Sequence, residues 1–317
     1  MRLADMIRED KNPYFDEFRK ALALATPFEI SAEVGRIAGQ IGRSSAAKVA
    51  EIMPFCRVPF KSAWFEWRGV SADFLPAGPK YDPQKPDRFG VLFSADGDDH
   101  SRATAVFAWG TRGIGVNVCP FAAMMDWSES PHIPDFARIT SVDDSLKHYR
   151  KTGTFKNDSD EDIKAIINRG TLIANPMMLK FWKDMLLASG GRKLPINLTQ
   201  TWADDINGEP GFAEALLAVI NSRNLVAITP DTTDLTKLNR ARAKRGKPPM
   251  LQFRKVTVSL SRSATARASQ RGDGAMPLHT VRGHFKVRKS GIYWWSPYWR
   301  GDASVGVVSR TGYTVKP

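Results

Sequence analysis

The sequence has little cysteine and histidine and no long apolar run, and each shortage excludes a class of protein. Its 317 residues include 2 cysteines and 5 histidines, too few at these spacings for a structural zinc site. Cys56 and Cys119 fit a reducing compartment, although two thiols could pair in an exported chain. The longest apolar runs, such as Ala215–Ile220, fall far short of the ~20 residues that a membrane-spanning helix needs. The opening MRLADMIRED lacks the apolar core of a signal peptide. We therefore expect a cytoplasmic protein with no metal, no cofactor and no membrane partner.

Acidic residues are almost missing from the last quarter of the chain. Residues 237–317 contain 18 Lys and Arg but only Asp273 and Asp302 as acids, a local net charge of +16. The whole chain carries +13, so the residues before this segment sum to −3. Such an asymmetry indicates an anionic partner, and without a membrane span it favours a nucleic acid.

The length and the 42% of apolar residues indicate a folded protein with two domains or one large domain. We expect an α+β fold in which residues 1–230 form a near-neutral mixed body and residues 231–317 form a small basic module of one helix and antiparallel strands.

In the body, helical spacing predicts helices over the first fifty residues, the second from about 28 to 52. An antiparallel meander is predicted from Phe60 to about Cys119. Helices follow, one between the N-cap Asn175 and Gly190, and an apolar one over 212–222. The run from Asp96 to His100 predicts a hairpin turn, with a cation site as the alternative.

In the basic module, a short helix through Leu235, Leu238 and Ala241 is predicted to end at Gly246 and the following prolines. The segment contains no acid, which favours phosphate binding over an ordinary solvated helix end. Leu251–Leu260 is predicted as a strand with a bulge near Arg254 or Lys255.

The next predicted strand, over residues 279–288, alternates apolar residues with a cationic face. A turn at Lys289-Ser290-Gly291 leads to a partner strand over 292–295. The run Pro297–Gly301 follows, and short strands are predicted around 305–309 and 313–315. We expect these strands to form a small antiparallel sheet or a partly open barrel.

Aromatic rings among Lys and Arg are typical of surfaces that bind single-stranded RNA, because bases stack on the rings while the cations hold phosphates. A small sheet also needs large side chains in its core, so the alternative is that the tryptophans are buried there and do not bind RNA. The candidate nucleic-acid-binding residues are Lys237, Arg240, Arg242, Lys244, Arg245, Lys247, Arg282, His284, Lys286, Arg288, Trp294, Trp299 and Arg300.

Two other functions stay open. A metal-independent ribonuclease could use His279, Arg282 and His284, but two histidines five residues apart on a regular strand point to opposite faces, so they would converge only at a break in the strand. The second alternative is an inhibitor that binds only protein. No nucleophile-elbow, phosphate-loop or zinc-protease motif is found, so nothing in the sequence requires an enzyme.

Three runs of residues carry a resemblance to a known family. They are Pro59-Phe60 with Trp64-Phe65-Glu66-Trp67, Leu238–Arg242 continuing into Arg245–Pro249, and His279–Phe285 with Trp294-Trp295, Pro297 and Arg300-Gly301. Together they resemble a broad family of phage, prophage and plasmid proteins that includes the type V anti-CRISPR family. The likeness is strongest over about 235–317, where Val281 stands in place of the first arginine of an Arg-Arg-Gly-His run.

The resemblance implies an accessory protein of a mobile element, acting in a bacterial host cell. Anti-CRISPR proteins of that family lower expression of the CRISPR effector through a translation-coupled loss of its mRNA. The expected partners are therefore RNA or the ribosome, together with a host or defence protein. The expected protein is not an enzyme.

Overall fold

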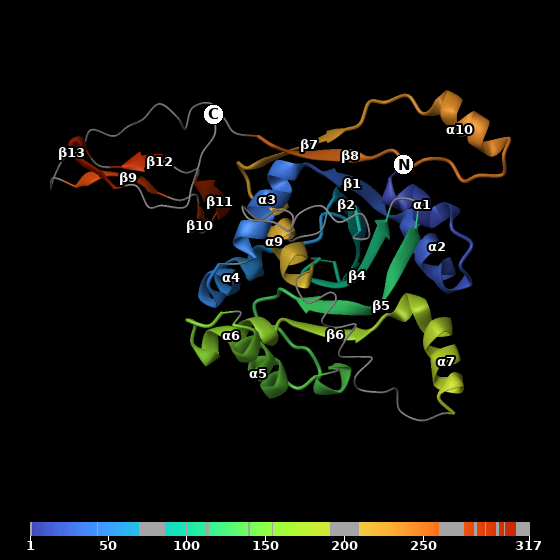
Figure 1. Ribbon diagram of the computed structural model, residues 1–317, viewed down its shortest axis with the longest axis horizontal. Helices are drawn as coiled ribbons and strands as arrows, with labels where there is room; N and C mark the ends of the chain where they lie inside the picture. The colour runs from blue at the N-terminus through green and yellow to red at the C-terminus, as the bar shows by residue number, and fades with distance from the viewer. Residues whose placement is uncertain are drawn as a thin grey trace.

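The computed structural model describes residues 2–42, 44–69, 86–98, 100–111, 114–138, 140–153, 155–190, 209–259, 276–281, 284–288, 290–295, 298–300 and 302–308. Its centre is a mixed eight-stranded sheet (Figure 1). The strands, in their order across the sheet, are β6 (Gly170–Ala174), β5 (Gly115–Asp126), β4 (Arg102–Thr111), β3 (Arg88–Asp96), β2 (Ser62–Arg68), β1 (Thr26–Ile30), β8 (Arg254–Val258) and β7 (Val226–Pro230). The predicted α+β class is confirmed.

The strands from β2 to β5 form the predicted antiparallel meander. The hairpin turn is also confirmed, since β3 ends at Asp96 and Gly97 has a φ of 78°, a conformation that glycine adopts without strain. Among the described residues, no cluster of three or more potential metal ligands is found.

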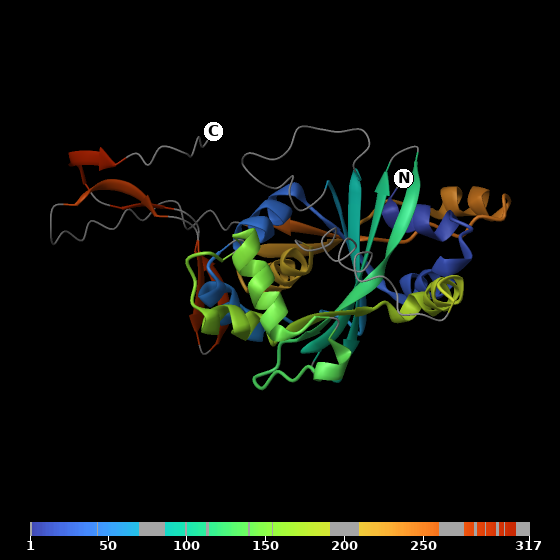
Figure 2. The ribbon, with the colours of Figure 1, turned by 60° about the horizontal axis from the view of Figure 1, so that its bottom comes forward.

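Helices cover both faces of the sheet (Figures 1 and 2). α1 (Leu3–Glu9) and α2 (Asp16–Leu24) pack on the side chains of Trp64 and Leu92. α3 (Ala32–Ile41), α4 (Ala46–Ile52) and α9 (Glu209–Asn221) pack on the opposite face, where Phe65 and Val91 point. Consecutive residues of a strand thus serve two cores, as the period of two requires. The predicted apolar helix is confirmed as α9, which is buried between layers.

Further helices lie around this centre. They are α5 (Val142–Thr152), α6 (Asp160–Ile167), α7 (Leu179–Ala188) and α10 (Thr236–Ala243), with short 3₁₀ turns η1 (Pro13–Phe15), η2 (Met53–Phe55), η4 (Asp135–Ala137) and η5 (Pro176–Met178). The predicted cap at Asn175 is confirmed, because its side chain accepts a hydrogen bond from the amide of Met177. Among the described residues, no helix is long and apolar enough to cross a membrane.

The prediction of continuous helix from about 28 to 52 is wrong at its start. Residues Thr26–Ile30 form β1, which is parallel to both β2 and β8. The helix begins only after Ser31, whose side chain accepts a hydrogen bond from the amide of Val34. β1 is buried between β2 and β8. Pairing with these distant strands therefore determines its structure, and its local sequence pattern does not.

The prediction of one continuous strand over residues 279–288 is wrong, because this stretch contributes to two separate strands. β9 (Pro277–Val281) pairs with β12 (Tyr298–Arg300) and, in parallel, with β13 (Asp302–Val308). β10 (His284–Arg288) pairs with β11 (Gly291–Trp295) in a separate antiparallel sheet. The described residues therefore form two small sheets, one of which includes a parallel pair. The strand predicted around 313–315 lies outside the described residues.

The predicted bulge near Arg254 is also absent. β8 starts at Arg254, so Phe253 precedes the strand and packs beneath α1, while Val256 faces the other core. Because β7 and β8 pair with each other and β8 pairs with β1, the boundary expected at residue 230 falls between two strands of one sheet.

Candidate nucleic-acid interface

The β10–β11 hairpin has two chemically different faces. Its register pairs His284 with Trp295 and Lys286 with Tyr293, and places Arg288 opposite Gly291. In antiparallel strands, directly paired residues share a face. The outer face therefore presents three basic side chains and two aromatic rings from ten residues of strand. His284, Lys286, Arg288 and Trp295 are exposed, and Tyr293 is half-buried.

The cations and rings of this outer face contact one another. The Nζ atom of Lys286 lies 4.6 Å from the centre of the Trp295 ring, and the guanidinium of Arg288 lies 5.6 Å from that of Tyr293. The ring centres of His284 and Trp295 are 6.0 Å apart. Trp295 is 39% exposed, so part of its ring is open to a planar partner. A nucleobase could stack there with cations within reach of its phosphates.

The inner face of the hairpin is fixed to the body of the protein. Ile292 and Trp294 belong to the buried core cluster, and Phe285 packs edge-on against Trp294. The backbone of Trp294 exchanges two 2.9 Å hydrogen bonds with the Asn224 side chain, in the segment between α9 and β7. The hairpin is thus held by its apolar face and by one strand edge, which leaves the cationic face outward.

Ser290 of the turn and Arg223, which lies beside Gly291, extend the outer face. The Ser290 hydroxyl lies 3.1 Å from the Tyr293 hydroxyl, and this contact lowers the pKa of Tyr293, with the charges of Arg223 and Arg288 acting in the same direction. Gly291 has a φ of 128°, and a side chain there would approach the Arg223 guanidinium. Arg223 therefore adds a third cation, after Lys286 and Arg288, close to Tyr293.

The basic segment around α10 forms a second cationic surface. α10 ends as predicted, with Gly246 at a φ of 65° and the prolines beyond it. Its side chains at Lys237, Arg240, Lys244 and Arg245 are exposed. The segment contains no acid of its own, but Glu9 of α1 pairs with it. It forms ion pairs of 2.8 Å with Arg242 and 2.6 Å with Lys247.

Through these ion pairs, Arg242 helps to fix the basic segment to α1. Its side chain is 11% exposed, and its Nε atom donates a hydrogen bond to the carbonyl of Pro248. The hydrogen bond from Lys247 and the charge of Arg242 lower the pKa of Glu9. Arg8 donates a further hydrogen bond from α1 to the carbonyl of Pro249. Arg242 and Lys247 thus anchor the segment, while its other basic side chains face solvent.

The two cationic surfaces do not adjoin. Both views place α10 and the β10–β11 hairpin on opposite sides of the molecule (Figures 1 and 2). Residues of one basic stretch of sequence are therefore separated by the fold, because β8, which pairs with both β1 and β7, lies between α10 and the hairpin along the chain.

The structure changes the set of candidate aromatic residues. Trp294, expected at the interface, is 8% exposed and lies in the core, because its position on β11 faces inward. Tyr293 and Trp295 take the outward positions. The sequence does contain a clue to these two rings. His284 and Lys286 are on the basic face of the predicted strand, and the residues paired with them on β11 are Trp295 and Tyr293.

The histidines of the ribonuclease alternative lie on different strands, His279 on β9 and His284 on β10. The candidate Arg282 lies outside the described residues, as do the side chains of His279 and Trp299. Arg300, at the end of β12, is exposed.

Comparisons of the chain with family models, with curated protein sequences and with solved structures gave no match.

Proposed function

We propose that this protein binds single-stranded RNA on the outer face of the β10–β11 hairpin. The observation that carries the proposal is the shared face of Lys286, Arg288, Tyr293 and Trp295, set on a hairpin whose opposite face is buried in the core. Rings that are already positioned lose little conformational entropy when bases stack on them.

The chemistry of this face fits a single strand better than a duplex. Bases of a single strand are free to stack on Trp295 and Tyr293, whereas bases in a helix already stack on each other. Lys286 and Arg288 lie over these same rings and would hold the phosphates on either side of a stacked base. Stacking on exposed rings is tolerant of sequence, so we expect little preference for one base.

The resemblance of residues 235–317 to the type V anti-CRISPR family suggests a setting for this activity. In that setting, RNA or ribosome binding by the hairpin, together with recognition of a host or defence protein by the body, lowers expression of the recognised protein.

Fluorescence anisotropy with a labelled single-stranded RNA tests the proposed interface. Trp295→Ala should weaken binding by about 1 to 3 kcal/mol, the usual value of one stacked base, while Trp295→Phe keeps a ring and retains most of the affinity. Both variants should unfold at the temperature of the unchanged protein, because the side chain is on the outer face. Absence of RNA binding at low salt, or equal affinity of the Ala and Phe variants, would overturn the proposal.

A further inference from the structure

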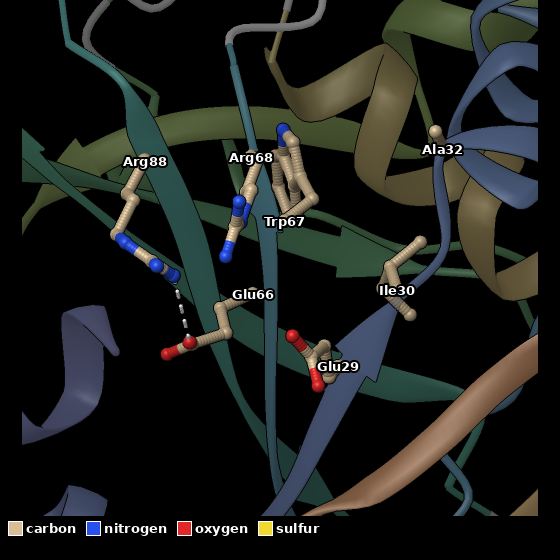
Figure 3. Close-up of a pocket in the computed structure, with 7 residues that line it drawn as sticks. All are labelled: Glu29, Ile30, Ala32, Glu66, Trp67, Arg68 and Arg88. Carbon is tan, nitrogen blue, oxygen red and sulfur yellow. Dashed lines mark ion pairs between the residues drawn. The ribbon is translucent and has the colours of Figure 1, made fainter. Parts of the chain in front are cut away.

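A charged pocket of about 120 Å³ opens at the carboxyl ends of the parallel strands β1 and β2 (Figure 3). In sheets with parallel strands, this edge is where ligands are usually held, because the chain leaves each strand there and opens a crevice. The pocket is lined by Glu29, Ile30, Ala32, Glu66, Trp67, Arg68 and Arg88.

The register of three strands arranges the charges in two rows. Glu29 of β1 pairs with Glu66 of β2, and Arg68 of β2 pairs with Arg88 of β3. Glu66 and Arg68 are two residues apart on one strand, so they point to the same face about 7 Å apart along it. A row of two carboxylates therefore lies beside a row of two guanidinium groups. Figure 3 shows the Arg68 guanidinium directed toward the two carboxylates.

Glu66 is the deepest of these groups and is incompletely satisfied. It is 1% exposed, and its Oε2 atom accepts hydrogen bonds of 3.0 Å from the amide of Ala4 and from Nε1 of Trp64. Its Oε1 atom is buried and has no hydrogen-bond partner among the described residues. The nearest cation, NH1 of Arg88, is 3.6 Å away (Figure 3), which is beyond hydrogen-bond distance. A buried carboxylate oxygen in this state favours a ligand that brings a donor.

Burial raises the pKa of Glu66, although Ala4, Trp64 and Arg88 act against this effect. Glu29, the second carboxylate, is held in place from the other side by Arg2, whose NH2 atom lies 3.1 Å from Oε2 of Glu29. The guanidinium of Arg2 also lies 3.9 Å from the centre of the Phe253 ring. The carboxylate row is therefore positioned before any ligand arrives.

We propose that this pocket binds a small zwitterion, a free amino acid or a compound of the same charge pattern. Its ammonium group would donate hydrogen bonds to Oε1 of Glu66 and to Glu29, and its carboxylate would lie between Arg68 and Arg88. Guanidinium groups bind carboxylates through paired hydrogen bonds, which suits the second row. A divalent cation fits the pocket less well, because the two guanidinium groups would oppose its charge.

Isothermal titration calorimetry with a panel of free amino acids tests this proposal. We expect at least one of them to bind, and to bind at least tenfold more tightly than a simple amine or a simple carboxylate of similar size. Each single-charge analogue can satisfy only one row of the pocket. If no amino acid binds at millimolar concentration, or if a carboxylate alone binds as tightly as the best amino acid, the proposal is wrong.

Two variants assign the binding to this pocket. Arg68→Ala removes an exposed side chain, and Glu29→Gln removes one carboxylate charge. Each change should lower the affinity for the tightest-binding amino acid at least tenfold. Arg36→Ala, an exposed arginine of α3 outside the pocket, is the matched control and should bind like the unchanged protein. Loss of binding in the control or full binding in both pocket variants would contradict the assignment. The Trp295→Ala variant should keep amino-acid binding, so this test is independent of RNA binding.

Discussion

Glu214 places an ionisable group inside the core. It lies on α9, where its Oε1 atom accepts a 3.2 Å hydrogen bond from Nε1 of Trp127. Burial raises its pKa to about 7, despite that hydrogen bond and the charge of Arg169. Burial of the Cys56 thiol, together with the nearby Glu214 carboxylate, raises the pKa of this thiol, so Cys56 is a poor nucleophile at neutral pH.

The raised pKa makes stability depend on pH. Between the ordinary value for a glutamate and about 7, the folded protein holds a proton on Glu214 that the unfolded chain has released. Stability therefore falls as pH rises through this window, by on the order of 3 kcal/mol, and is constant with respect to this group above it.

We predict that Glu214→Gln removes this part of the pH dependence, because glutamine keeps an acceptor for Trp127 but does not ionise. Urea unfolding at pH 5 and pH 8 should show a smaller loss of free energy of unfolding in this variant than in the unchanged protein. Glu33→Gln, on the exposed face of α3, is the control and should leave the loss unaltered. Equal losses in all three proteins would show that Glu214 does not titrate in this range.

Gly90 is required by the close packing of one tryptophan. A Cβ atom at Gly90 of β3 would lie 2.3 Å from the ring of Trp64, which is fully buried. We predict that Gly90→Ala lowers the free energy of unfolding by about 1 to 3 kcal/mol, the cost of overpacking a rigid core. In the control, Gly211→Ala, the new group would meet no other described residue within 4 Å apart from its chain neighbours and its own helix. A helical alanine there should be neutral or stabilising by up to about 1 kcal/mol. Denaturant melts of both variants test the prediction, and equal stabilities would contradict it.

At the scale of elements, α1 holds the basic segment of α10 through one acid. Glu9 pairs with both Arg242 and Lys247, and its lowered pKa means that this stabilisation is present above the ordinary pKa of a glutamate and is lost as pH falls through the folded value. These ion pairs are only partly exposed to water, so they should contribute more to the free energy of unfolding than a fully exposed salt bridge does.

We predict that Glu9→Gln loosens the segment and costs about 1 to 3 kcal/mol, because Arg242 keeps its charge in a nearly buried position. Hydrogen exchange should quicken at the amides of α10 while the central strands stay protected. The control is Glu17→Gln, which breaks a pair with Lys20 in which both side chains are mostly exposed. It should cost well under 1 kcal/mol and leave α10 unchanged. Unaltered exchange in the Glu9 variant would place the anchor of α10 elsewhere.

Elements with strong local signals could be predicted from the sequence. Capping at Asn175, the uniform apolar character of α9 and the Asp96-Gly97 turn are each produced by neighbouring residues, and each is present in the structure. β1 could not be predicted, because five residues containing Pro27 and Glu29 become a strand only through pairing with β2 and β8.

The candidate interface was predictable only in part for the same reason. Alternation along β10 identifies the outward cations, but which tryptophan faces outward depends on the register between β10 and β11. A shift of one residue exchanges Trp294 and Trp295 between core and surface. The acid that pairs with Arg242 lies more than two hundred residues away in the sequence and only the tertiary fold reveals it.

At the scale of the whole molecule, the net charge of +13 is distributed over separate surfaces. Among the described residues of the last quarter, one group of basic side chains lies on and just after α10 and another lies on the hairpin, on opposite sides of the molecule (Figure 1). If the hairpin binds RNA as proposed, we expect a short RNA to contact one surface and a long RNA to contact both. The contribution of each surface should depend on the length of the strand.

We predict this dependence from the salt sensitivity of binding, because each phosphate contact with a single strand adds about −0.7 to the slope of log K against log salt. For an RNA of about six nucleotides, Lys286→Glu with Arg288→Glu should flatten the slope by about two contacts, while Lys237→Glu with Lys244→Glu should leave it unchanged. For an RNA several times longer, both pairs of changes should flatten it. Anisotropy titrations of the two double variants over the same range of salt concentrations test this prediction. If the α10 changes flatten the slope for the short RNA as much as the hairpin changes do, the prediction is wrong.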